Sequence, residues 1–245
     1  MMLTQMNSYR NKDIKIDINN ISKNYGEVEV LRKINLTVYD GEFVSILGPS
    51  GCGKSTIFNL ISNLTECSEG NININGKLSY MYQKDLLLPY KTIIDNVCLP
   101  LTLMREKKNK AREKVKSYFE VFGLTGYEDK YPKELSGGMK QRANFLRTFV
   151  SSNDIMLLDE PFGALDSITK ASMQKWLLDV KNKVNSTILL ITHDIDEAIM
   201  LSDRIYVISK KPSVIKKEFV LDKKYYSNEK IENIANLKKK IIELL

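Results

Sequence analysis

The sequence predicts an α/β fold built on a mainly parallel sheet with helices on both faces. Two observations carry this prediction. Apolar stretches typical of buried strands alternate with helical patterns along the chain, and a glycine-rich segment lies between one such strand and one such helix. The length of 245 residues is enough for one large domain or two small ones.

The expected elements follow from local patterns of apolar residues and turns. Residues 14–18 alternate apolar and polar side chains, and short apolar runs elsewhere are bounded by glycine, asparagine or aspartate. A long stretch has apolar residues at helical spacing, including Val115, Phe119 and Phe122. We therefore expect strands at 14–18, 34–38, 42–47, 71–74, 79–82, 155–158, 188–192 and 205–208, with an inserted helical region at about 92–150.

The last 18 residues, 228–245, form an amphipathic pattern. Ile231, Ile234, Leu237, Ile241 and Leu244 recur at helical spacing. We expect this tail to form a helix that packs on the core rather than one that lies on a membrane.

Composition excludes several classes of protein. No apolar run reaches the roughly 18 residues of a transmembrane helix, and the polar N-terminus, residues 1–12, is not a secretory signal. Cys52, Cys67 and Cys98 are scattered, which favours a reducing compartment without disulfides or a zinc site. The net charge of +7 is spread along the chain, so we expect a solvated surface and no nucleic-acid partner.

The glycine-rich segment has the pattern of a phosphate-binding loop. Glycines let successive backbone N–H groups point at phosphate oxygens, and the following helix adds positive charge from its N-terminus. Lys54 is expected to reach the terminal phosphates, and the Ser55 hydroxyl to ligate Mg²⁺. A redox role for Cys52 is the less favoured alternative. The predicted nucleoside-triphosphate site comprises Gly48, Pro49, Ser50, Gly51, Cys52, Gly53, Lys54, Ser55 and Thr56.

A second motif places two acids at the end of an apolar strand. Residues 155–158 are all apolar, and Asp159 and Glu160 follow them. Mg²⁺ bridging the phosphates requires a carboxylate at the strand's C-terminal edge, which fits Asp159. Glu160 is expected to orient or deprotonate the attacking water.

A third motif, LSGGMKQR at 135–142, identifies a family. Alone, a serine and two glycines before a helix could be a simple cap and turn. With the two preceding motifs, the segment resembles the signature of ABC transporter ATP-binding cassettes. The resemblance covers about 14–220 and implies a P-loop NTPase cassette with an antiparallel β subdomain and a helical signature subdomain, followed by a separate tail at 221–245.

The resemblance also implies roles for further residues. Ser136, Gly137 and Gly138 would grip the γ-phosphate held by another copy's P-loop, so a head-to-tail dimer around two ATP is implied. Gln83 resembles the glutamine that touches Mg²⁺ and links the site to the transport partner, although a surface glutamine is more often simply solvated.

Three more positions match the family. Asp166 resembles an acid at the dimer interface, and His193, the sole histidine, resembles the switch histidine that contacts the γ-phosphate. Tyr25 resembles the aromatic residue that stacks on adenine. His193 and Tyr25 each have an ordinary alternative, since a lone histidine is often incidental and a core tyrosine would have the same pattern.

The resemblance implies an ATP-hydrolysing subunit at the cytoplasmic face of the cell membrane. It would bind permease subunits and act indirectly with an extracytoplasmic substrate-binding protein. Segments 83–97, 160–166 and 209–212 resemble nitrate/sulfonate/taurine-type importers, whereas 144–148 and 152–154 depart from that pattern. Importers of thiamine precursors and exporters remain alternatives. An ABC protein of translation or DNA repair, or a small-molecule kinase, is less favoured.

Overall fold

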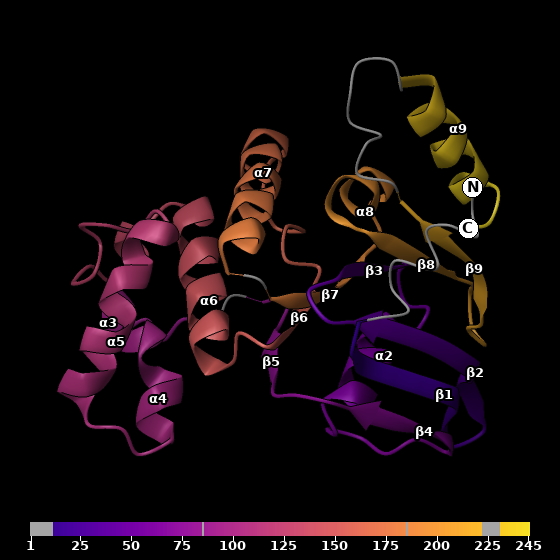
Figure 1. Ribbon diagram of the computed structural model, residues 1–245, viewed down its shortest axis with the longest axis horizontal. Coiled ribbons are helices and arrows are strands. Elements are labelled where there is room, and N and C mark those ends of the chain that lie inside the picture. The colour runs from indigo at the N-terminus through magenta and orange to yellow at the C-terminus, as the bar shows by residue number, and fades with distance from the viewer. Residues whose placement is uncertain (1–11, 85, 185, 222–230) are drawn as a thin grey trace. The chain divides into compact units, whose positions relative to one another are not determined.

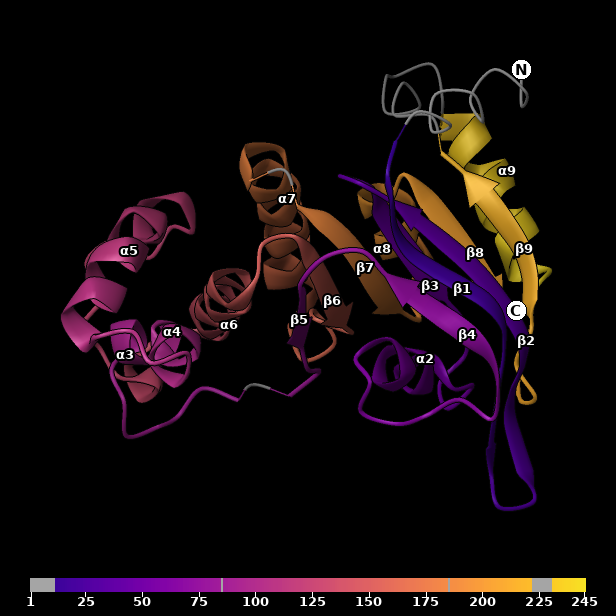
Figure 2. The same cartoon turned by 60° about the horizontal axis from the view of Figure 1, so that its bottom comes forward.

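The computed structural model describes residues 12–84, 86–184, 186–221 and 231–245. The chain forms two compact units, Met1–Gly76 with Ser186–Leu245, and Lys77–Asn185. Residues 1–11 of the segment that we interpreted as no secretory signal lie outside the described residues. The elements of both units are labelled in Figures 1 and 2.

The first unit contains an antiparallel sheet in the order β2-β1-β4. Its strands are β1 (Ile14–Tyr25), β2 (Val28–Tyr39) and β4 (Glu69–Ile74). Strands β1 and β2 are longer than the sequence predicts. Irregular register and left-handed residues interrupt the alternation of apolar and polar side chains, so the pattern reveals only part of each strand. Asn20 and Lys33 have φ of 51° and 45°, and Asn20 lies at one such shift.

A second sheet of this unit carries the order β7-β3-β8-β9. Strand β3 (Phe43–Leu47) lies between its parallel neighbours β7 (Thr187–Thr192) and β8 (Arg204–Ile208), and all three are fully buried. Strand β9 (Ile215–Val220) pairs antiparallel with β8. Strand β9 is not among the expected strands, because its half-exposed residues lack the long apolar run of a central strand.

The described residues of the first unit form three helices: α2 (Lys54–Ile61), α8 (Ile195–Leu201) and α9 (Ile231–Ile242). Ile241 of α9 is fully buried among residues of α8, β3 and β8, and Ile234, Leu237 and Leu244 pack against the same cluster. This packing confirms that the tail covers the core. Residues 228–230 of the predicted tail lie outside the described residues.

The second unit, in its described residues, contains two parallel strands and a set of helices. Strands β5 (Leu78–Met81) and β6 (Ile155–Asp159) are joined in register, with Tyr80 opposite Leu157. The core includes the predicted Val115, Phe119 and Phe122, each 1% exposed. The helices are α3 (Ile93–Val97), α4 (Leu99–Leu103), α5 (Lys108–Val121), the 3₁₀ helix η1 (Pro132–Glu134), α6 (Gly137–Ser151) and α7 (Ser167–Val184).

Among the described residues, every helix is too short or too polar to cross a bilayer.

An aromatic cluster fixes the packing of α6 and α7 in the second unit. The ring of Trp176 meets Phe122 and Phe145 edge-on, at centroid distances of 5.7 and 5.4 Å.

Candidate functional site

The predicted phosphate loop connects β3 to α2 in the first unit, as the sequence analysis expects. The loop turns through Gly51 and Gly53, whose φ values of 76° and 107° lie in the left-handed region. Gly53 directly precedes α2, whose first residues are Lys54 and Ser55. The N–H groups that begin a helix lack partners within it, so this segment can bind an anion.

Close packing also explains why positions 48 and 53 of the loop are glycine. A Cβ on Gly48 would lie 2.6 Å from Ile208 Cγ1 and 3.0 Å from Cys52 Sγ. A Cβ on Gly53 would lie 2.9 Å from a methyl of Val30. The loop is thus pressed against β8 and β2, which restrict its conformation.

Lys54 is buried and lies over the loop. Its Nζ donates to the carbonyl oxygens of Gly48 and Pro49, at 2.8 and 3.0 Å. The ammonium group is therefore held at the loop that would surround the phosphates. Neighbouring Ser55 is exposed and Thr56 is half-buried.

His193 lies at the same sheet edge as the phosphate loop. Leu47, the last residue of β3, pairs in register with Thr192, the last residue of β7. Gly48 follows β3 and His193 follows β7. The carboxyl ends of parallel strands share one edge of the sheet, so both residues lie at that edge. His193 is exposed there, and Asp194 after it caps α8 by accepting from the Glu197 N–H at 3.1 Å.

Tyr25 ends β1 with 49% of its surface exposed. The alternative of a core aromatic is therefore wrong. The Lys23 ammonium lies 4.9 Å from the ring centroid, which adds a cation–π contact. An exposed ring of this kind is available for stacking.

A buried hydroxyl that no sequence motif indicates lies behind the phosphate loop. Ser213, fully buried, donates from Oγ to the carbonyl oxygen of Cys52, and its N–H donates to the Val30 carbonyl at 2.9 Å. Ser213 therefore ties the loop to β2. Cys52 itself is buried, and burial raises the pKa of its thiol, so the alternative of a reactive thiolate is not favoured.

In the second unit, the structure brings together Gln83, Asp159 and Glu160. Gln83 Nε2 donates to Glu160 Oε2 at 3.3 Å, so this exposed glutamine has a specific partner. Asp159 is 6% exposed at the end of β6 and accepts at Oδ2 from the Tyr80 hydroxyl at 3.1 Å. Tyr80 is not part of any motif in the sequence.

Glu160 has an unusual backbone conformation. Its φ of 43° lies in the left-handed region, which costs on the order of 1 kcal/mol for a residue with a side chain. Its carbonyl accepts from the Gly163 N–H at 3.1 Å, and Gln141 donates to the next carbonyl, that of Pro161. These bonds stabilise the turn that follows β6 at Glu160.

The signature segment begins α6. Ser136 Oγ accepts from the Met139 N–H at 3.3 Å, so the cap that we considered as an alternative is present. Gly137 is the first helical residue, and a Cβ on Gly138 would lie 3.1 Å from Thr169 Cγ2. Ser136 and Gly137 are exposed.

Asp166 lies just before α7. Its Oδ1 accepts from the N–H groups of Ile168 and Thr169 at 3.1 and 3.0 Å. Hydrogen bonds from Thr169 and from the backbone N–H groups lower the pKa of Asp166. The residue therefore begins a helix as well as matching the family's interface acid.

The donors predicted for a metal have the chemistry that Mg²⁺ prefers. They are the carboxylate of Asp159, the hydroxyl of Ser55 and the amide oxygen of Gln83, all oxygen ligands. No group of three or more His, Cys, Asp or Glu in the described part of the chain could hold a metal. The magnesium site therefore stays a prediction that rests on the chemistry of these mixed oxygen donors.

Comparison with known proteins connects these features to a family. Residues 31–163 match the family described as ABC transporter. The chain is 45% identical over 223 residues to the formylaminopyrimidine import ATP-binding protein ThiZ of Halalkalibacterium halodurans, covering 88% of this chain and 90% of that protein. It is 38% identical over 240 residues to the aliphatic sulfonates import ATP-binding protein SsuB of Bacillus cereus, covering 93% and 94%.

A solved structure gives the same result in three dimensions. The dimeric post-hydrolysis state of the ATP-binding cassette MJ0796, bound to ADP and Pi, superposes with a TM-score of 0.71 at 30% identity. The match covers 84% of this chain and 99% of that one. The predicted ABC cassette fold is confirmed. This chain therefore belongs to the ABC transporter family and is one of its ATP-binding, ATP-hydrolysing subunits.

Proposed function

We propose that two copies of this chain bind two MgATP head to tail, close, drive a membrane permease to its other conformation, and reopen after hydrolysis. The observation that carries the catalytic part is the hydrogen bond from Gln83 to Glu160 beside Asp159. This contact supports a role in which Gln83, a proposed metal ligand, also contacts Glu160, the proposed general base.

In the first unit, Lys54 and the P-loop amides hold the phosphates. The shared edge of β3 and β7 supports a γ-phosphate contact for His193. Tyr25 offers an exposed ring to adenine. Ser55 supplies a hydroxyl to Mg²⁺, which when bound neutralises charge on the β- and γ-phosphates.

In the second unit, Asp159 and Gln83 supply the remaining metal ligands. Glu160 accepts a proton from the attacking water as the water oxygen bonds to the γ-phosphorus. The bond between that phosphorus and the oxygen bridging to ADP breaks, so ADP and phosphate leave. Ser136, Gly137 and Gly138 complete the site on the partner copy, and Asp166 faces the dimer interface.

The transport direction follows from the relatives. Both curated relatives described above carry import in their names, which supports an importer. The chain would then be peripheral at the cytoplasmic face, bound to permease subunits and acting with an extracytoplasmic substrate-binding protein.

As domain boundaries we propose a cassette at 14–220, with the helical insertion at about 92–150, and a tail at 221–245.

Two cargo classes fit. The sulfonate-type motifs support the nitrate/sulfonate/taurine class, whereas the 45% identity to the formylaminopyrimidine protein exceeds the 38% to the sulfonate protein and favours a thiamine precursor. Uptake assays with a labelled formylaminopyrimidine and a labelled alkanesulfonate, in cells with and without this chain, separate the two.

Affinity purification from detergent-solubilised membranes tests the transport role. The tagged wild-type chain should recover a multi-span permease, identified by mass spectrometry. Lys116→Ala changes one exposed side chain of α5 and serves as a surface control that should recover the same permease. Recovery of ribosomes or DNA-repair factors without any permease would overturn the transport role while leaving the ATP site intact.

A further inference from the structure

Strand pairing places Tyr80 beside the carboxylate of Asp159. Tyr80 lies opposite Leu157 in the parallel register of β5 and β6. Alternate residues of a strand share a face, so Tyr80, Leu157 and Asp159 point to the same side. The Tyr80 hydroxyl closes this geometry by donating to Asp159 Oδ2 at 3.1 Å.

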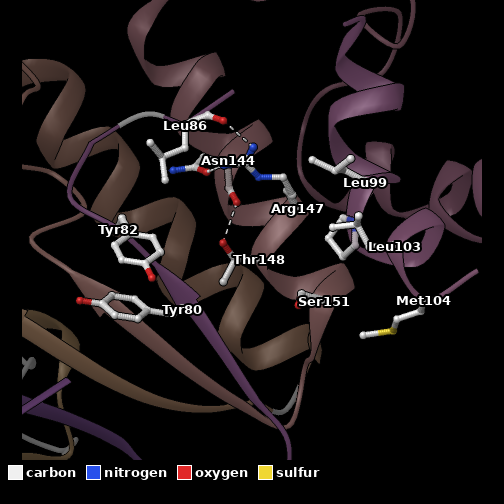
Figure 3. A pocket seen from close by; sticks show the side chains of 11 residues that line it. Tyr80, Tyr82, Leu86, Leu99, Leu103, Met104, Asn144, Arg147, Thr148 and Ser151 are labelled. Carbon is white, nitrogen blue, oxygen red and sulfur yellow. Dashed lines mark hydrogen bonds between the residues drawn. The ribbon is translucent and has the colours of Figure 1, made fainter. Parts of the chain in front are cut away.

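A second tyrosine fixes the position of the Tyr80 ring. Tyr82 lies two residues further along the chain and therefore on the same side. The two rings stack with centroids 4.1 Å apart and an interplanar angle of 17°. Figure 3 shows both rings along one side of a pocket of about 430 Å³, opposite Leu99 and Leu103.

Burial makes the hydroxyl important for the carboxylate. Asp159 is 6% exposed, so water cannot readily replace a lost partner. A donor that holds Oδ2 restricts rotation of the carboxylate. Partners of a metal-binding carboxylate commonly set its orientation in this way.

We propose that Tyr80 is a positioning residue for Asp159: its hydroxyl, held by the stack on Tyr82, orients the carboxylate for a divalent metal. The inference rests on the proposed function, in which Asp159 ligates Mg²⁺. It adds a residue that no motif marks, and it differs from Gln83, whose side chain reaches Glu160 instead.

Mn²⁺ binding to the full chain tests the inference without measuring turnover. Free Mn²⁺ is followed by electron paramagnetic resonance during titration of protein saturated with a non-hydrolysable ATP analogue. Tyr80→Phe keeps the ring and removes the hydroxyl, and we expect Mn²⁺ to bind roughly 10-fold more weakly. Nucleotide affinity in the absence of metal should stay within about twofold.

Tyr82→Phe is the matched control, because it removes the neighbouring hydroxyl and retains the stacked ring. Its Mn²⁺ affinity should equal that of the wild type. Equal affinities for Tyr80→Phe and wild type would overturn the inference, and so would a parallel loss of metal-free nucleotide affinity, which would indicate general disruption. A wild-type chain without nucleotide-dependent Mn²⁺ binding would instead refute the proposed metal site itself.

Discussion

The two units carry different parts of the proposed site and build them differently. In the first unit, the phosphate loop is shaped by backbone packing, with Gly48 and Gly53 pressed against β8 and β2. In the second unit, side-chain hydrogen bonds position the acids, from Tyr80 to Asp159 and from Gln83 to Glu160. The difference suggests that nucleotide binding and hydrolysis can be changed separately.

The largest effect is expected for the proposed general base. Glu160→Gln retains the size of the side chain but removes the proton acceptor. Turnover should fall about 10²- to 10⁴-fold, while ATP affinity stays within about twofold. Phosphate release and fluorescent-nucleotide binding measure the two quantities, with the exposed Glu120→Gln as control. Unchanged turnover in Glu160→Gln would refute the assigned base.

The next effect concerns the stability of the first unit. Ile241→Ala removes a fully buried side chain where α9 packs on α8, and should lower the free energy of unfolding by about 2–5 kcal/mol. The adjacent Ile242, 55% exposed, offers a control in which alanine should cost far less. Urea denaturation compares the two. Equal losses would show that the tail does not depend on this packing.

A third prediction tests the binding half of the comparison. Lys54→Ala removes a charged donor that is held at the phosphate loop, and should weaken ATP binding about 10- to 100-fold. The loss should appear in nucleotide titrations without any hydrolysis step. If Lys54→Ala kept full affinity and only turnover fell, the division between the two units would be wrong.

The smallest effect is pH-dependent and belongs to the second unit. Asp95 on α3 pairs with Lys108 and Arg112 of α5. Partial burial raises the pKa of Asp95, but hydrogen bonds from Lys108 and Arg112 outweigh it and lower the pKa overall. The stabilisation is therefore present above the ordinary aspartate pKa and is lost as pH falls through the lowered value.

Asp95→Asn should remove this acid dependence. We expect it to cost at most about 1 kcal/mol at neutral pH and little once the pH is below the lowered pKa of Asp95. Thermal unfolding across pH measures the difference between variant and wild type. A variant that lost equal stability at both pH values would exclude this ionic contribution.

Much of the candidate site could be proposed from sequence, because its motifs are local. The P-loop, the acids after β6 and the signature serine each depend on spacings of a few residues between a strand or turn and a helix. Tyr80 and Ser213 could not be predicted in this way. Their partners lie 79 and 161 positions away, so only the fold brings them together.

Backbone detail also escaped prediction. The left-handed conformation of Glu160 is a property of the turn after β6 and has no glycine to signal it. The half-exposed β9 lacks an apolar run, although its pairing with β8 is regular apart from one register shift. Tertiary context determines both features.

The proposed cycle depends on two copies closing around two ATP, and the mass of Glu160→Gln in solution tests this most directly. Light scattering after size exclusion should give roughly twice the single-chain mass with MgATP and the single-chain mass without it. Adding Ser136→Arg replaces the exposed signature serine with a bulky side chain. This second substitution should restore the single-chain mass with MgATP. A single-chain mass for nucleotide-saturated Glu160→Gln would contradict the head-to-tail dimer.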